Sequence, residues 1–328
     1  MINQVNQIFL CSFLFLSLFP VSFAQPASHW VSYPSANQTA YGVYHFRKSF
    51  ELDKVPDKMV IHVSADNRYN LFVNGKRVCY GPAKGDLKTY KYDIIDIAPF
   101  LHIGENLLAA LVFNGGDDKP MAFISVQTAF MLRVENSNFS ELNTNSNWKV
   151  YKNPAYRVIS YHEMLFKERW FYGFYACGGG DEIFAEKYPW GWETTGFDDS
   201  GWIAAEPLLF DKQPPWNLVP RNIAFMDDHL AYPAKIRKVN NVNIPVGKWD
   251  GTSSLTIPAN TSANILIDFE VLTMGYPELT VHGGAGSRIQ VKYAEALYEA
   301  VHLKAHRDSV NNLNMFGVWD IFHADGGE

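Results

Sequence analysis

Cysteine is scarce in this sequence, with 3 cysteines in 328 residues. The sequence contains no CxxC and no HExxH motif, so neither of these zinc-binding spacings is available. Cys11 lies in an N-terminal apolar run, which leaves Cys79 and Cys177 for the folded protein. These two residues could form a disulfide in an oxidising compartment, or they could stay as two buried free thiols, because a chain of this length builds a core without a disulfide.

Positive charge is also in short supply. The 28 Lys and Arg residues are outnumbered by 34 Asp and Glu residues, which gives a formal net charge of −6, and the sequence has no basic run. A surface that binds phosphates needs clustered Lys and Arg side chains. The composition therefore argues against nucleic acid as a partner and favours neutral ligands.

Long apolar runs are absent except at the N-terminus, where residues 8–23 are predominantly apolar. This run is short for a bilayer span, which needs roughly 20 apolar residues. Small residues three before and one before a cut after Ala24 match a signal-peptidase site, although residues 1–7 contain no Lys or Arg. We expect residues 1–24 to be a signal peptide and the protein to be exported, periplasmic or extracellular, without a stable membrane span. An uncleaved anchor is the alternative.

Extended helical periodicity is lacking, and short apolar segments separated by turn residues take its place. This pattern predicts an all-β fold built from sandwich domains. Asn74-Gly75 is the strongest turn signal and predicts a two-residue type I′ hairpin. The strands expected in the first half lie at 44–50, 59–65, 69–73, 107–113, 122–127 and 130–134.

The first sandwich is expected to occupy residues 25–210, with residues 151–210 supplying its closing strands and long loops. Residues 211–233 contain four prolines and are interpreted as a linker, because proline removes ladder donors.

A second sandwich is expected at residues 234–328, where residues 287–293 alternate between apolar and polar side chains. Residues 283–286 would be a hairpin turn rather than a phosphate loop, because they precede a strand. Residues 324–328 resemble a turn, so we expect a missing strand after them and an incomplete second sandwich. The other strands expected here lie at 263–269, 278–282 and 316–322.

No catalytic residue can be assigned from the sequence. A glycosidase needs two carboxyl groups across the scissile bond, but the acidic pairs at 117–118, 198–199 and 227–228 are neighbours in the chain and would point to opposite faces of a strand. No GxSxG motif is present.

Two groups of residues are candidates for binding a sugar. Trp190 and Trp192 lie in a loop bounded by Pro and Gly, where an indole could stack on the apolar face of a sugar ring. Asp66, Asn67 and Arg68 lie between two expected strands and could form a polar rim. For both groups a structural role, in the core or in a turn, is the alternative.

Several motifs in order along the chain resemble the N-terminal, non-catalytic region of bacterial α-L-rhamnosidases of glycoside hydrolase family 78. The match is carried by FRKSF at 46–50, VSADNRY at 63–69, VNGK at 73–76, YDIIDIAP at 92–99, WNLVPR at 216–221, YAEALY at 293–298 and GVWDIF at 317–322.

This resemblance implies jelly-roll, galactose-binding-like sandwiches in an enzyme that hydrolyses terminal α-L-rhamnosyl residues with inversion. It places the catalytic (α/α)6 barrel beyond Glu328, so this chain is expected to be inactive alone. It implies a rhamnose-containing oligosaccharide or polysaccharide as partner, and a calcium ion as a possible cofactor, with no ligand set identified. A self-sufficient, lectin-like secreted protein is the alternative.

Overall fold

A computed structural model describes residues 29–34, 39–168 and 177–327. The expected signal peptide lies outside the described residues. The all-β prediction is confirmed, because strands dominate and the one described α-helix is α1 (Tyr161–Glu168). Within the described ranges, no helix is long and apolar enough to cross a membrane.

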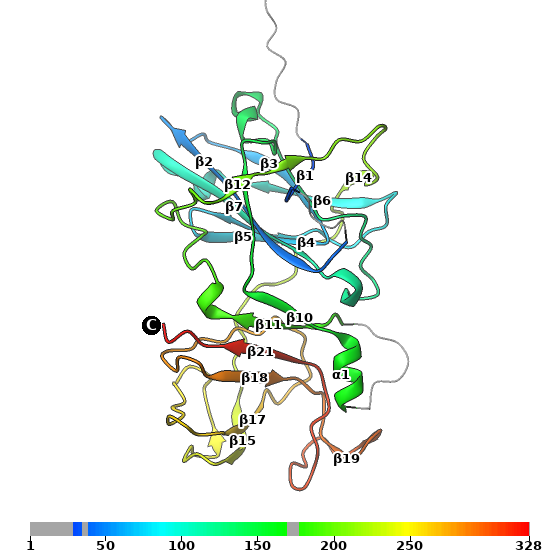
Figure 1. Ribbon diagram of the computed structural model, residues 1–328, viewed down its shortest axis with the longest axis vertical. Helices are drawn as coiled ribbons and strands as arrows, with labels where there is room; N and C mark the ends of the chain where they lie inside the picture. The colour runs from blue at the N-terminus through cyan, green and yellow to red at the C-terminus, as the bar shows by residue number, and fades with distance from the viewer. Residues whose placement is uncertain (1–28, 35–38, 169–176, 328) are drawn as a thin grey trace, which may run out of the picture.

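The upper part of the molecule in Figure 1 is a sandwich of two six-stranded sheets. The first sheet has the order β13-β1-β8-β3-β6-β14, and the second has the order β12-β9-β2-β7-β4-β5. The strands of the first sheet are β1 (Val31–Ser32), β3 (Val60–Asp66), β6 (Tyr90–Asp96), β8 (Ala129–Val134), β13 (Glu206–Pro207) and β14 (Leu218–Pro220). The strands of the second are β2 (Gly42–Leu52), β4 (Arg68–Val73), β5 (Lys76–Gly81), β7 (Gly104–Asn114), β9 (Lys149–Lys152) and β12 (Ile203–Ala204).

The core of this sandwich follows from alternation along its strands. In β4 the side chains of Tyr69, Leu71 and Val73 are buried and alternate with less buried residues. They pack against apolar residues of the opposite sheet in one large cluster, which includes Phe130 and Trp148. Burying one face of each sheet in this way fixes the strand register.

The predicted hairpin is confirmed. Val73 pairs with Lys76, and Asn74 and Gly75 have φ angles of 51° and 81°. Positive φ at both central residues is what a type I′ turn requires. The Asn74 side chain also donates to the Phe100 carbonyl at 3.0 Å and accepts from the Leu107 backbone N–H at 2.8 Å, so the turn is tied to its neighbours.

A four-stranded sheet lies beneath the sandwich in Figure 1, with the order β10-β11-β21-β18. Its strands are β10 (Tyr156–Ile159), β11 (Gly180–Phe184), β18 (Arg288–Lys292) and β21 (Trp319–His323). The structure differs here from the sequence prediction, because β10 and β11 leave the first sandwich and β11 pairs in parallel with β21. Residues 149–152, 203–204 and 206–207 do supply strands to the sandwich.

The hairpin predicted around residues 283–286 is wrong. Strand β18 pairs with β21, and residues 278–282 form no strand. The turn instead contacts the C-terminal segment, since Gly283 donates to the Gly327 carbonyl at 3.0 Å and Gly286 to the Ala324 carbonyl at 2.9 Å. Periodicity identified β18 but could not select its partner.

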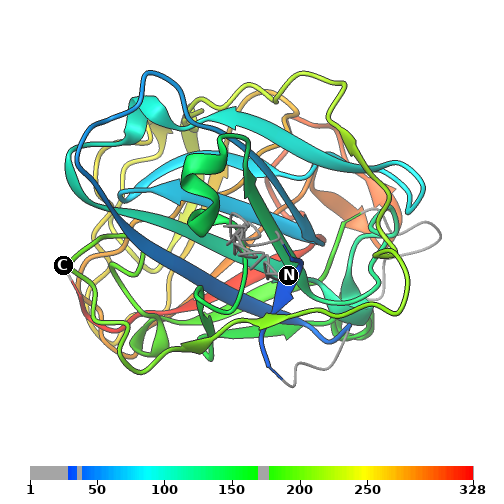
Figure 2. The same cartoon turned by 90° about the horizontal axis from the view of Figure 1, so that it is seen from above.

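The remaining strands form two small sheets. One has the order β16-β15-β17 and the other pairs β19 with β20. Figure 2, viewed from above, shows the orange and red C-terminal part of the chain beneath the sandwich. The strands are β15 (Lys235–Asn240), β16 (Gly247–Lys248), β17 (Asn264–Asp268), β19 (Tyr298–Ala300) and β20 (Leu303–Lys304).

The proline-rich residues 211–233 are held against the sandwich. Strand β14 pairs in parallel with β6, and Arg221 forms an ion pair with the fully buried Asp93. The two cysteines are both free, with Cys79 buried and Cys177 exposed. A disulfide between them is therefore absent.

Two acidic residues meet where the sandwich rests on the four-stranded sheet. Asp181 on β11 accepts from the Tyr41 hydroxyl at 2.8 Å, and Asp320 on β21 accepts from the Tyr293 hydroxyl at 2.9 Å. The Asp181 backbone N–H donates to the Asp320 carboxylate at 2.7 Å. Burial raises the pKa of Asp181 from 3.8 to about 6; the Tyr41 hydrogen bond opposes this shift and the charge of Asp320 adds to it.

Candidate functional site

The tryptophan loop predicted as a sugar-binding surface places its two indoles in different environments. Trp192 is 2% exposed and packs on Leu107 and Ala109, on the outer face of the second sheet. Trp190 is 58% exposed, and its indole N–H lies 3.1 Å from both the Ala185 carbonyl and the Asp325 carboxylate. Only Trp190 presents a large apolar surface to solvent.

A buried arginine anchors this loop. Arg47 is 2% exposed; it pairs with Asp199 at 2.9 Å and donates to the carbonyls of Trp192 and Thr194. Lys149 contacts the same carboxylate at 2.5 Å. Burial alone would raise the pKa of Asp199, but hydrogen bonds from Lys149 and Arg47 lower it overall. Asp199 thus holds the tryptophan loop in place through its ion pairs with Arg47 and Lys149. The loop covers the outer face of the second sheet.

Asp66, expected in a polar rim, is fully buried at the end of β3. It accepts hydrogen bonds from the Ser125 hydroxyl and the Val126 backbone N–H, each at 2.6 Å, and from the Trp216 indole at 3.1 Å. Burial raises the pKa of Asp66 above its ordinary value, although the hydrogen bonds from these donors oppose the shift. A carboxylate with so many protein donors holds the loop after residue 120 in place, and its oxygens are engaged by the protein itself.

Asn67 and Arg68 follow directly and turn toward a surface hollow. The Asn67 side chain is 5% exposed and accepts from the Gly115 backbone N–H at 2.9 Å. Arg68 is partly exposed and donates to the Pro82 carbonyl at 2.7 Å. One residue between two strands therefore separates a buried acid from a solvent-facing guanidinium.

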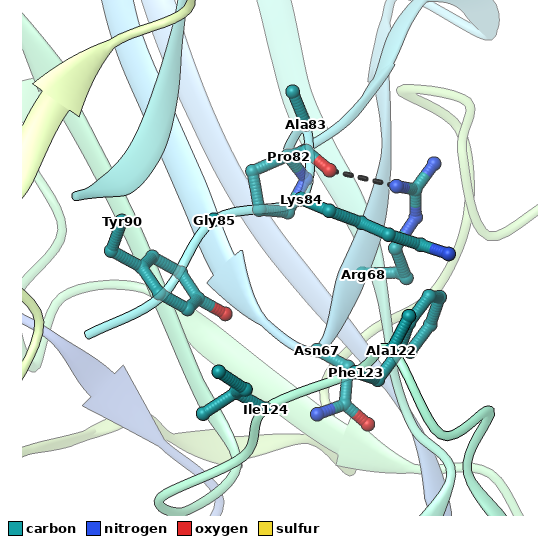
Figure 3. Close-up of a pocket in the computed structure, with 10 residues that line it drawn as sticks. All are labelled: Asn67, Arg68, Pro82, Ala83, Lys84, Gly85, Tyr90, Ala122, Phe123 and Ile124. Atoms are coloured by element: carbon teal, nitrogen blue, oxygen red, sulfur yellow. Dashed lines mark hydrogen bonds between the residues drawn. The ribbon is translucent and has the colours of Figure 1, made fainter. Parts of the chain in front are cut away.

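This hollow is a shallow pocket at the start of β4, and we take it as the candidate site. Figure 3 shows the Tyr90 hydroxyl pointing into it and the Lys84 side chain reaching across it toward Phe123. The Lys84 ammonium lies 4.8 Å from the centre of the Phe123 ring, and the Arg68 guanidinium carbon lies 5.9 Å from it. The pocket is lined by Asn67, Arg68, Pro82, Ala83, Lys84, Gly85, Tyr90, Ala122, Phe123 and Ile124.

The two groups of predicted residues do not come together. Asn67 and Arg68 lie at the start of β4, whereas the tryptophan loop passes the hairpin at its other end, where a Cβ on Gly75 would lie 3.4 Å from Thr194. The sequence prediction also missed Lys84 and Phe123. Lys84 was not among the predicted site residues, and Phe123 was assigned to a strand at 122–127, which the structure does not contain.

Calcium takes six to eight oxygen ligands, usually with several carboxylates. Within residues 29–34, 39–168 and 177–327, no group of three or more His, Cys, Asp and Glu side chains is arranged to hold a metal ion. Asp66, the carboxylate next to the pocket, is engaged by protein donors.

Comparison with known proteins gives a family. Residues 54–223 match the profile of the α-L-rhamnosidase N-terminal domain. No curated protein matches the sequence.

Solved structures similar to this chain include three α-L-rhamnosidases. The GH78 rhamnosidase of Bacillus sp. GL1 is 25% identical, with a TM-score of 0.54 over 66% of this chain and 22% of its own length. The α-L-rhamnosidase of Streptomyces avermitilis, solved with L-rhamnose, is 19% identical, with a TM-score of 0.58 over 88% and 25%. That of Aspergillus terreus is 18% identical, with a TM-score of 0.56 over 92% and 31%.

The chain thus spans between 22% and 31% of the length of these enzymes. The matched region runs from residue 54 to residue 223, which is more than half of the chain and includes every residue that lines the pocket. This protein belongs to the family of α-L-rhamnosidase N-terminal domains.

Proposed function

We propose that this chain is the accessory, carbohydrate-binding part of an exported α-L-rhamnosidase that acts on rhamnose-containing oligosaccharides or polysaccharides. The family match over residues 54–223 carries the proposal. The pocket supports it, because it combines an apolar wall at Phe123 and Ile124 with donors on Asn67 and Arg68. Sugar rings offer apolar faces and hydroxyl groups, which need both kinds of partner.

Hydrolysis belongs, in this proposal, to the part of the enzyme that this chain does not span. An inverting glycosidase needs two carboxyl groups roughly 6.5 to 9.5 Å apart with room for a water molecule between them. Asp181 and Asp320 are linked through a backbone N–H and capped by tyrosine hydroxyls at a packed junction. This arrangement favours a structural role for both.

The binding half of the proposal is tested by calorimetric titration of the chain with L-rhamnose and with neutral rhamnosyl oligosaccharides at millimolar concentration. We expect weak binding that Phe123→Ala reduces and Trp190→Ala leaves unchanged. The reverse result would move the site to the tryptophan loop. Parallel titrations with added calcium and with a chelator test the metal, and we expect the two curves to agree.

The catalytic half is tested with an aryl α-L-rhamnoside. We expect no turnover by this chain under conditions in which a full-length α-L-rhamnosidase is active. Turnover that disappears when one of the chain's own Asp or Glu residues is changed would contradict the assignment of hydrolysis to the rest of the enzyme.

A further inference from the structure

The charge of the candidate pocket is opposite to that of the whole protein. The chain carries a formal net charge of −6, yet the residues that line the pocket include Arg68 and Lys84 and no Asp or Glu. Two acids adjoin the lining residues in the sequence: Asp66 is fully buried and bonded to Ser125 and Val126, whereas Asp86 is exposed and accepts from the backbone N–H groups of Lys88 and Thr89. The lining itself therefore carries two positive charges on an acidic molecule, with one exposed carboxylate, Asp86, beside it.

The two cations have donors to spare. Among the described residues, neither Arg68 nor Lys84 forms an ion pair. Arg68 has one hydrogen bond, to the Pro82 carbonyl, out of the five N–H groups that a guanidinium carries. Lys84 contacts the face of Phe123. A cation over an aromatic ring keeps most of its capacity to bind an anion, because that contact is weak at an exposed site.

One further donor lies beside these cations. The Asn67 amide carries two N–H groups and donates one of them to Asp66, whereas the Tyr90 hydroxyl uses its single proton on the Ala65 carbonyl. Neutral sugar hydroxyls need acceptors as well as donors, and the side chains that line the pocket supply no carboxylate acceptor. A carboxylate needs donors alone, and a guanidinium matches its two oxygens.

We propose that the pocket binds the carboxylate of a uronic acid residue within a glycan, with Arg68 and Lys84 as the charge partners and Phe123 and Ile124 beside the sugar ring. This inference rests on the proposed function, since it names the class of glycan that the same site takes. It makes the ligand of this domain an acidic glycan, in contrast to the neutral ligand that the overall composition favours.

The experiment compares one glycan with and without its charge. Trigalacturonate and its fully methyl-esterified form are titrated against the chain by calorimetry. We expect the acid to bind about two- to fivefold more tightly than the ester, which is the scale of one exposed charge pair. Raising the salt concentration from about 0.02 M to about 0.2 M should weaken binding of the acid and not of the ester.

Substitutions locate the site. Lys84→Gln should reduce the affinity for the acid toward that for the ester, and Arg68→Lys should reduce it in part by removing the planar fork. Lys76→Gln is the matched control, because Lys76 also contacts an aromatic ring, that of Phe100, and follows the far end of β4. Thermal melting of each variant checks that the fold is retained.

The results separate this inference from the proposed function. Equal binding of acid and ester, or an affinity for the acid that Lys84→Gln leaves unchanged, would overturn the uronate site even if neutral rhamnosyl oligosaccharides bind. Absence of binding by every glycan would overturn both proposals. A preference for the acid that Lys84→Gln lowers, without any binding of neutral rhamnosides, would support the uronate site and contradict the rhamnoside partner.

Discussion

At the scale of single residues, Asp181 offers a testable prediction, because burial moves its pKa into a range where protein stability can be measured. Its pKa of about 6 lies above the ordinary value of 3.8, chiefly because of burial. A carboxyl group with a raised pKa in the folded state adds stability below its unfolded pKa, and this contribution is lost as the pH rises through the folded value. The stability contributed by Asp181 is therefore lost as the pH rises from about 4 to about 6.

Asp181→Asn should flatten this part of the stability profile. The amide oxygen can still accept from Tyr41, and no charge is buried beside Asp320. The unfolding free energy of the variant relative to wild type should therefore rise by about 1 to 3 kcal/mol as the pH increases from 4 to 7. Urea denaturation across that range measures the gain. Asp198→Asn, at an exposed acid, is the control, and parallel profiles for wild type and Asp181→Asn would contradict the prediction.

The residues of the candidate site were only partly accessible from the sequence. Arg68 was found because it lies between two recognisable strands, and Asn67 with it. The burial of Asp66 and Trp192 could not be predicted, because it depends on Ser125 and on β7, which are distant in the chain. Lys84 carried no local signal beyond a turn, since its role comes from a loop folded across it.

At the scale of elements, the sequence identified strands better than partners. Strands β2, β3, β4, β7 and β8 were predicted within a few residues because alternation and turn residues are local properties. The pairing of β18 with β21 and of β11 with β21 is set by packing between distant segments. No periodicity within a strand encodes that choice.

The hairpin between β4 and β5 provides the prediction at this scale. Gly75 has a φ of 81°, and a Cβ there would lie 3.4 Å from Thr194, an ordinary contact. Gly75→Val should therefore lose more than about 1 kcal/mol through backbone strain rather than collision. Chemical denaturation measures the loss. Gly196→Val is the control, because a Cβ at Gly196 meets nothing within 4 Å, and equal stability of the two variants would contradict a type I′ turn.

At the scale of the whole molecule, we expect export and removal of residues 1–24. The apolar run at residues 8–23 and the small residues before Gln25 motivate this expectation. Intact-mass analysis of the secreted protein should give a chain that begins at Gln25. A mature protein that still carries Met1 would show that the segment is an uncleaved anchor.

The parallel pairing of β11 with β21 also determines when the four-stranded sheet can form during synthesis. Asp181 and Asp320, which touch across this pair, are 139 residues apart in the chain. All strands of the upper sandwich, through β14 at Leu218–Pro220, leave the ribosome before β21 does. Because domains form from the N-terminus onward and distant contacts close late, the sandwich can fold first. Strands β10 and β11 then form an antiparallel pair whose edge at β11 stays unpaired until β21 has been synthesised.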